Sequence, residues 1–269
     1  MITIGLAPNL LHFRGLTITW HSLVTVVSIG LAVFLISRWA RNEGLDDKMV
    51  PAIAPWAILG GIVGARLLFV LDNWGFFRVN PWQMLAVWSG GIAVYGAIAG
   101  GVVAGTLYAL HKRFPVRRLL DLAAPALILV QGIGRLGDLI NGEHFSSAST
   151  LPWAVRYSNP ESPAFGMSAQ HPAVAYEMLA DFALFGVLWF LRRRLKPDGT
   201  LFVLYAMLYS LIRLPLSLLR QDSASGAFGL NQQGWAAMVV LAGALTLWLK
   251  LRPQWVHLET KAQMTARAR

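Results

Sequence analysis

The 269-residue chain is strongly apolar and basic: 56% of its residues are hydrophobic, 13% are charged, and its formal net charge is +10 at pH 7. A soluble domain carries about a quarter charged residues, so this composition excludes an ordinary water-soluble fold and predicts a membrane protein. The lack of cysteine excludes disulfides, thiolate metal sites and a cysteine nucleophile.

Apolar stretches long enough to span a bilayer, which takes about 20 residues, recur along the chain. We predict an all-α integral membrane protein with seven transmembrane helices, at 18–38, 50–72, 84–110, 119–140, 173–191, 199–219 and 232–250. The first stretch has no basic region before it and no small-residue cleavage site after it, so we interpret it as a retained helix. With neither a soluble domain nor an internal repeat in view, we expect a single polytopic domain over 1–269.

The lysines and arginines gather on alternate connections between the predicted helices. Most of the 23 lie in four segments, at 38–48, 112–118, 192–196 and 250–269, whereas the opposite side holds Arg14, Arg78, Arg156 and Arg220. Positive charge is retained in the cytoplasm, so we expect the N-terminus outside and the C-terminus in the cytoplasm. The basic charge then reflects membrane topology, and we expect no nucleic-acid partner.

The longest predicted connection is 141–172, on the outer side between the fourth and fifth helices. It is rich in serine, proline and asparagine. Connections of this length are uncommon without a function, so it is a candidate functional element.

The stretch GIGRLGDLING, 132–142, contains the G-x-G-x-x-G pattern of a dinucleotide-binding turn. That fingerprint requires a preceding strand within a βαβ unit, whereas this stretch closes an apolar run. We therefore interpret the match as accidental and Arg135 as a charge inside the membrane. No metal-binding histidine pair, acidic cluster or nucleotide-binding lysine is recognisable, and we expect no metal and no cofactor.

Three arginines, Arg66, Arg135 and Arg213, lie inside apolar runs. At about 1.5 Å per residue, each is roughly 20–24 Å from the cytoplasmic end of its helix. Intramembrane arginine is costly and indicates a functional site. Alternatives remain open: Arg66 pairs with Asp72 or extends to the interface, and Asp138 neutralises Arg135. With few acids at that depth, two guanidiniums favour a phosphate oxyanion such as a lipid headgroup.

Other polar side chains are expected at the same outer level. They are His21, Tyr95, Asp138, Asn141, Glu143, His144, His171 and Tyr209. Tyr209 precedes Arg213 by four residues, so both point to one helix face. The glycines of 89–105 favour close helix packing over a ligand loop.

The segment GRLGDLINGE, 134–143, resembles the G-R-x-G-N-F-I-N-G-E signature of the prolipoprotein diacylglyceryl transferase family. The resemblance covers nearly the whole chain, because further segments resemble family motifs in the same order. These are TITWHSL at 17–23, GGIVGARLLFVL at 60–71, WSGGIAVYGAIAGG at 88–101, QHPAVAYE at 170–177 and YSLIRLPLSLLRQ at 209–221.

The resemblance implies transfer of the diacylglyceryl group from phosphatidylglycerol to the lipobox cysteine of a preprolipoprotein, the first step of bacterial lipoprotein maturation. A thioether forms and glycerol 1-phosphate leaves, so the nucleophile belongs to the substrate. The implied location is the bacterial cytoplasmic (inner) membrane, with the active site toward the outer half of the bilayer. The implied partners are phosphatidylglycerol, the preprolipoprotein signal peptide and the lipid bilayer.

Helix depth and the resemblance together predict the site residues. The predicted catalytic residues are Arg135, Arg213, Tyr95 and His21. The predicted phosphatidylglycerol-binding residues are Arg135, Arg213, Asp138, Glu143, Tyr209, Arg66 and Asn141, with His171, Tyr176 and Arg220 in support.

Four positions depart from the family pattern. The third-span histidine is Tyr95 here, the first-helix tyrosine is His21, the signature asparagine is Asp138, and the glutamate after the sixth-span arginine is Ser217. Tyrosine, with a pKa of about 10, is a poor base at neutral pH. Three alternatives stay open: His21 supplies the base, the arginines act without a dedicated base, or the chain is a divergent paralogue.

Two other classes of function compete with the transferase. A lipid transporter, scramblase or non-catalytic paralogue would use the arginines to bind or pass anionic phospholipid, but a transport path predicts polar residues continuing toward the cytoplasm. The inner halves, such as LAVFLIS at 31–37 and VVAGTLYAL at 102–110, are almost wholly apolar. A purely structural membrane protein gives no reason for two arginines at one depth.

Overall fold

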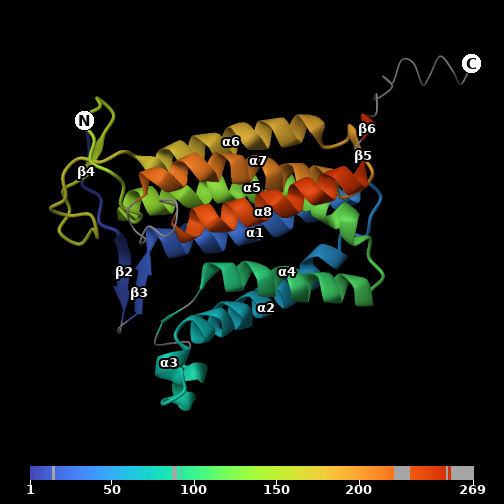
Figure 1. Ribbon diagram of the computed structural model, residues 1–269, viewed down its shortest axis with the longest axis horizontal. Helices are drawn as coiled ribbons and strands as arrows, with labels where there is room; N and C mark the ends of the chain where they lie inside the picture. Colours follow the sequence, from blue (N-terminus) through green and yellow to red (C-terminus); the bar gives the residue numbers. More distant parts are fainter. Residues whose placement is uncertain (14–15, 87–89, 92, 221–230, 253, 256–269) are drawn as a thin grey trace, which may run out of the picture. The chain divides into compact units, whose positions relative to one another are not determined.

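The computed structural model describes residues 1–13, 16–86, 90–91, 93–220, 231–252 and 254–255 (Figure 1). Seven of the described helices are long and apolar enough to cross a membrane, which confirms the predicted all-α membrane fold. They are α1 (Trp20–Asn42), α2 (Met49–Asp72), α4 (Val94–His111), α5 (Val116–Asn141), α6 (Ala173–Leu191), α7 (Thr200–Leu219) and α8 (Gln232–Leu251). The orientation across the membrane stays a prediction.

The remaining elements are short. Helix α3 (Trp74–Phe77) and the 3₁₀ helix η1 (Pro81–Leu85) follow α2. Within the described residues, three two-stranded sheets pair β1 (Ile2–Ile4) with β4 (Val155–Tyr157), β2 (Asn9–Phe13) with β3 (Leu16–Thr19), and β5 (Leu195–Lys196) with β6 (Gln254–Trp255).

The third spanning helix begins later than predicted, at Val94 instead of residue 84. Pro81 opens the 3₁₀ helix, and Gly90 and Gly91 have φ angles of 82° and 79°, which a continuous α-helix does not allow. The predicted boundary is therefore wrong. Residues 87–89 and 92, which include Trp88 of the third-span motif, lie outside the described residues, as do 221–230 and 256–269.

The chain divides into two compact units, each described by itself. The hairpin unit comprises residues 33–119, and the bundle unit comprises residues 1–32 and 120–269. In the hairpin unit, α2 and α4 run antiparallel with their backbones in contact. A Cβ added to Gly64 would lie 2.3 Å from Gly96 O, and one added to Gly100 would lie 2.2 Å from Gly60 O. This contact confirms the close helix packing predicted for the glycines of 89–105.

The core of the bundle unit lies between α5, α6 and α7. Its buried members are Ala124, Ile128, Leu184, Leu188, Leu201 and Tyr205. Helix α8 packs against α7, and Figure 1 shows α5 to α8 side by side. The first turn of α1 touches α5 at Gly137, where an added Cβ would lie 2.7 Å from His21 Cα.

The long connection 142–172 folds over one end of this bundle. Its strand β4 pairs in parallel with β1, matching Ile2 with Val155. Tyr157 in β4 donates a hydrogen bond from its hydroxyl to Leu139 O at 2.8 Å, and burial raises the pKa of Tyr157 to about 12. The connection also reaches the end of α7, because Ser147 N donates to Leu219 O at 3.0 Å. The connection thereby joins the ends of α5 and α7, the helices that carry Arg135 and Arg213.

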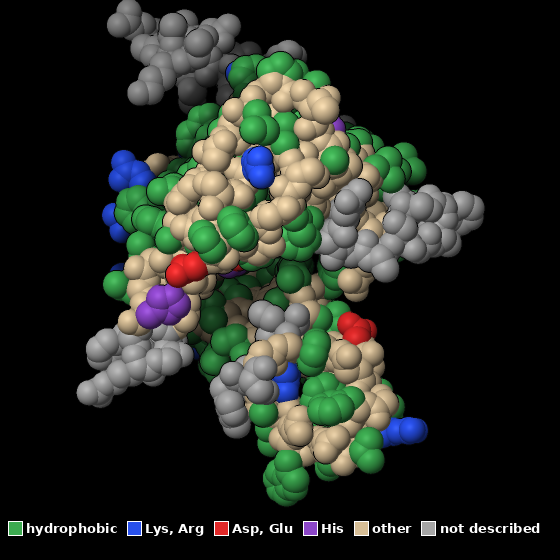
Figure 2. Space-filling view, turned by 90° about the vertical axis from the view of Figure 1, so that its left-hand side faces the viewer, with side chains coloured by type: hydrophobic (Ala, Val, Ile, Leu, Met, Phe, Trp, Pro, Cys, Tyr) green, Lys and Arg blue, Asp and Glu red, His purple; other side chains and the backbone are tan. Residues whose placement is uncertain are grey.

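Large apolar side chains are exposed along the spanning helices. On α2 they include Leu59, Ile62, Val63 and Leu67. Figure 2, which views the end of the molecule that carries β4, shows hydrophobic side chains scattered among backbone and polar atoms. In water the exposed apolar side chains of the helices would drive aggregation, whereas in a bilayer they face lipid.

Candidate functional site

One buried carboxylate organises the polar end of the bundle unit. Glu177, in the second turn of α6, is 2% exposed. Its Oε1 accepts hydrogen bonds from Arg135 Nη2 on α5, at 2.6 Å, and from Arg213 Nη1 on α7. Arg220 Nη1, just after α7, lies 3.9 Å from Glu177 Oε2. The structure thus brings Arg135 and Arg213 together, through an acid that the sequence analysis did not name as a site residue.

Two further side chains join Arg213 to its surroundings. Its Nη2 donates to Gln233 Oε1, in the first turn of α8, at 2.6 Å. Tyr209 donates from its hydroxyl to Glu177 Oε1 at 3.5 Å. Tyr209 and Arg213 therefore share one helix face and one acceptor, and four helices contribute to the same cluster.

Asp138 is the second acid of the site. It is 2% exposed, and its Oδ2 accepts a hydrogen bond from Arg135 Nη1 at 2.7 Å. On its other side, Asp138 Oδ1 lies 2.5 Å from His21 Nδ1, at the start of α1. His144 Nε2 lies 3.6 Å from Oδ2. Asp138 therefore pairs with Arg135, one of the two roles considered for it, and also links that arginine to His21.

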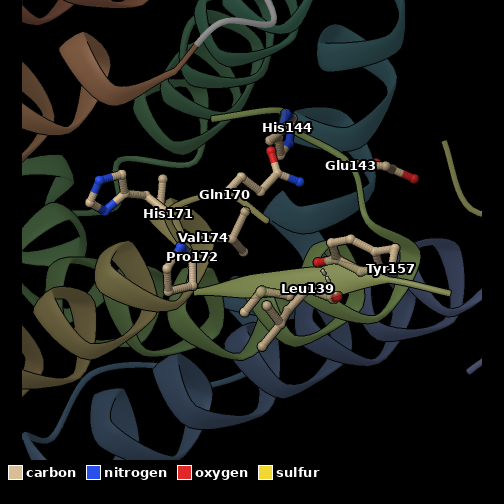
Figure 3. Close-up of a pocket in the computed structure, with 10 residues that line it drawn as sticks. Leu139, Glu143, His144, Tyr157, Gln170, His171, Pro172 and Val174 are labelled. Atoms are coloured by element: carbon tan, nitrogen blue, oxygen red, sulfur yellow. Dashed lines mark hydrogen bonds between the residues drawn. The ribbon is translucent and has the colours of Figure 1, made fainter. Parts of the chain in front are cut away.

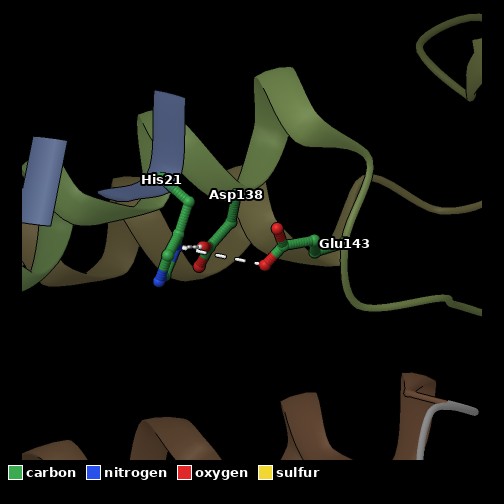
Figure 4. A group of neighbouring side chains, drawn as sticks. All are labelled: His21, Asp138 and Glu143. Atoms are coloured by element: carbon green, nitrogen blue, oxygen red, sulfur yellow. Dashed lines mark hydrogen bonds and ion pairs between the residues drawn. The ribbon is translucent and has the colours of Figure 1, made fainter. Parts of the chain in front are cut away.

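Glu143 and Asn141 complete this side of the cluster. Asn141 Nδ2 donates to Glu143 Oε1 at 2.8 Å, and Glu143 Oε2 lies 4.0 Å from His21 Nδ1. Figure 4 shows His21, Asp138 and Glu143 together, with the imidazole against the aspartate. Arg220 Nη2 donates to His144 Nδ1 at 2.5 Å. Because His144 also approaches Asp138, the residues around the two acids form one network.

A small pocket, partly open to solvent, lies beside this network and is lined mainly by the connection 142–172 (Figure 3). Glu143, His144, Tyr157 and His171 contribute to its lining. His171 Nδ1 lies 3.5 Å from the hydroxyl of Tyr176. Two residues predicted to support the site, His171 and Tyr176, therefore contact each other at the start of α6.

Arg66 lies in the hairpin unit and is 7% exposed. Its guanidinium donates to four backbone carbonyls: Nε to Met84 O at 2.9 Å, Nη1 to Gly90 O at 2.6 Å and Gly91 O at 2.9 Å, and Nη2 to Gln83 O. These contacts tie η1, together with Gly90 and Gly91 after it, to α2. The predicted role of Arg66 in binding lipid stays a prediction.

Tyr95 also belongs to the hairpin unit, in the first turn of α4, where it is half-buried. Its predicted catalytic role stays a prediction.

Two acids of α6 escaped the sequence analysis. Glu177 was visible as the last residue of the QHPAVAYE segment, and Asp181 follows it by one helical turn. Asp181 is 0% exposed, and neither of its carboxylate oxygens has a hydrogen-bond partner among the described residues. The available signal was two ionisable residues within one predicted span, because such residues face the interior of a bundle.

Comparison with known proteins gives a consistent family. A family model described as prolipoprotein diacylglyceryl transferase matches residues 8–250. The chain is 35% identical to the phosphatidylglycerol-prolipoprotein diacylglyceryl transferase of Thermosynechococcus vestitus over 217 residues, which cover 79% of this chain and 81% of the relative. It is 35% identical to the protein of the same name from Nostoc sp. over 254 residues, covering 91% and 90%. A Frankia casuarinae protein of that name is also 35% identical, over 88% of this chain and 59% of its own length.

Proposed function

The chain belongs to the prolipoprotein diacylglyceryl transferase family, and we propose that it transfers the diacylglyceryl group of phosphatidylglycerol to the lipobox cysteine of a prolipoprotein. The proposed site is the polar cluster at the end of the bundle unit. The observation that carries this assignment is the convergence of Arg135, Arg213 and Arg220 on the carboxylate of Glu177.

The reaction breaks a carbon–oxygen bond and leaves negative charge on the phosphate of glycerol 1-phosphate. Guanidiniums stabilise that charge more strongly as it develops, which lowers the barrier without merely tightening lipid binding. Arg135 Nε is buried and has no hydrogen-bond partner among the described residues, so this donor remains for a phosphate oxygen. Glu177 keeps the mutually repelling guanidiniums together until the headgroup arrives.

The depth of the cluster suits a lipid substrate. This multi-pass membrane protein carries the site near the first residues of α6, and the same helix ends directly before Arg192, Arg193 and Arg194. Positive connections remain in the cytoplasm, so we place the cluster in the outer half of the bacterial cytoplasmic membrane. A prolipoprotein cysteine and a phosphatidylglycerol headgroup both reach that level.

The test uses purified protein in liposomes containing phosphatidylglycerol and a peptide with a lipobox cysteine. Glycerol phosphate release and the mass gain of the peptide are followed together. We expect both to require the cysteine, to stop when phosphatidylethanolamine replaces phosphatidylglycerol, and to fall about 10²–10³-fold in Arg213→Gln, as for loss of a preorganised donor. Arg156→Gln, at an exposed arginine of β4, is the matched control and keeps full activity.

A different outcome identifies the competing function. If the intact protein binds phosphatidylglycerol but never modifies the peptide, under conditions in which a related enzyme does, the transferase assignment fails. A lipid-binding paralogue then accounts better for the arginine cluster.

A further inference from the structure

His21 and Asp138 form a hydrogen-bonded pair between two helices of the bundle unit. His21 is the second residue of α1, its side chain is 45% exposed, and its Nδ1 lies 2.5 Å from Asp138 Oδ1. An ionised carboxylate only accepts hydrogen bonds, so Nδ1 carries the proton and Nε2 is left as the basic nitrogen. Figure 4 shows this second ring nitrogen turned away from both neighbouring carboxylates.

Two contacts hold the pair in place. The second oxygen of Asp138 accepts from Arg135 Nη1 at 2.7 Å, which fixes the plane of the carboxylate behind the imidazole. At Gly137, an added Cβ would lie 2.7 Å from His21 Cα, so a glycine is what lets α5 approach α1 this closely. Arg135 also binds Glu177, and a single side chain therefore connects the imidazole pair to the arginine cluster.

We propose that His21 is the general base of the reaction, taking the proton of the substrate thiol on Nε2, and that Asp138 is its positioning residue. This inference rests on the proposed function. A free thiol has a pKa of about 8.5 and reacts as the thiolate, so most of it needs deprotonation at neutral pH. An imidazole titrates near neutrality, and a buried carboxylate behind it sets its tautomer and stabilises the imidazolium.

The reaction needs only the two substrates and His21, because every bond that forms is matched by one that breaks. The thiol proton moves to His21 Nε2, and the sulfur electron pair forms a bond to the terminal glycerol carbon of the diacylglyceryl group. The bond from that carbon to the phosphate oxygen breaks, and its electron pair leaves on glycerol 1-phosphate. The imidazolium then returns the proton to the departing phosphate or to water, which restores the base for the next peptide.

Other ionisable groups face the pair, and they define the competing explanation. Glu143 Oε2 lies 4.0 Å from His21 Nδ1, and His144 Nε2 lies 3.6 Å from Asp138 Oδ2. Ligand atoms of His21, Asp138 and Glu143 all lie within 4.8 Å of one another, a separation that one cation spans. Proton transfer and metal binding at this cluster therefore have to be distinguished by experiment.

The experiment compares two lipobox peptides, one with cysteine and one with selenocysteine, in the liposome assay. A selenol ionises well below neutral pH and needs no base, so it bypasses the proposed role of His21. We expect His21→Gln to lower turnover of the cysteine peptide about 10²-fold or more, and to leave the selenocysteine peptide close to the wild-type rate. Asp138→Asn shows the same selective loss to a smaller extent. His12→Gln, at an exposed histidine of β2, is the matched control and turns over both peptides normally.

Each contrary outcome is specific. Equal loss on both peptides makes His21 structural, and unimpaired His21→Gln removes it from the reaction. If Tyr95→Phe selectively loses turnover of the cysteine peptide while His21→Gln keeps it, Tyr95 is the base instead of His21. Wild-type turnover that stops with a chelator and returns with Zn²⁺ replaces the base by a metal site. If the wild-type protein modifies neither peptide, the proposed function itself fails. This result differs from failure of the His21 proposal alone, in which the wild-type protein remains active.

Discussion

Arg66 in the hairpin unit and Arg135 in the bundle unit are both arginines of membrane-spanning helices, yet they differ in what accepts their hydrogen bonds. Among the described residues, the four acceptors of Arg66 are all backbone carbonyls, and its guanidinium lies over the rings of Phe69 and Phe77, at 5.6 and 5.4 Å. The acceptors of Arg135 are the carboxylates of Asp138 and Glu177, and its Nε has no partner among the described residues.

This difference separates two uses of the same side chain. Backbone carbonyls stay in place as long as their segment is folded, so we expect Arg66 to stabilise the packing of η1, Gly90 and Gly91 against α2. A side-chain carboxylate, such as that of Glu177 on α6, is an anion that a phosphate oxygen can displace. We therefore expect the kind of acceptor, more than the depth in the membrane, to distinguish a substrate-binding arginine from a structural one.

Removing the shared acid should have the largest effect. Glu177→Gln leaves Arg135, Arg213 and Arg220 without their common countercharge, and breaking a buried pair in this way costs about 3–5 kcal/mol. We expect a lower thermal unfolding temperature in detergent and a loss of turnover. Adding phosphatidylglycerol should restore more stability to the variant than to the wild type, because the phosphate supplies the missing negative charge.

Glu161→Gln, at an exposed acid of the long connection, is the control for this experiment and should melt like the wild type. Equal stabilisation of Glu177→Gln by phosphatidylglycerol and by phosphatidylethanolamine would contradict an anion site at the cluster.

Replacing Arg66 should lower the stability of the protein less than Glu177→Gln does, and should leave lipid binding unchanged. Arg66→Met leaves the carbonyls of Gln83, Met84, Gly90 and Gly91 without their donor. Because Gln83 and Gly90 are exposed and the other two residues are half-buried, water replaces most of these hydrogen bonds, and we expect a total cost of about 1–3 kcal/mol. We expect a lower unfolding temperature with an unchanged KM for phosphatidylglycerol in the folded fraction. Arg66→Lys should recover only part of the stability, because an ammonium cannot reproduce the planar fork.

The opposite result for Arg66→Met would contradict the proposed difference in role between Arg66 and Arg135. If Arg66→Met melts like the wild type and its KM for phosphatidylglycerol rises, Arg66 belongs to the substrate site, as the sequence suggested.

The sequence predicted the spanning helices because bilayer thickness fixes both their length and their apolar composition. It did not predict the partners of Arg66, because backbone carbonyls are present in every sequence. The role of Glu177 was missed for a related reason: which acid meets which arginine depends on how α5, α6 and α7 are rotated about their axes. The start of α4 was missed because two glycines with positive φ, at 90 and 91, interrupt a stretch that is apolar throughout.

The smallest expected effect concerns Asp181, which tests whether every acid of the bundle core serves the arginines. It lies one turn beyond Glu177, fully buried, with both oxygens lacking partners among the described residues. A buried charge without a partner is costly, so Asp181→Asn and Asp181→Leu should unfold at the same or a higher temperature, within about 1 kcal/mol of the wild type. Turnover should change less than about twofold, well below the effects of losing a group that acts directly in the reaction. Loss of turnover in both variants at unchanged unfolding temperature would instead make Asp181 part of the catalytic network, and the boundary of the site would extend one helical turn deeper into α6.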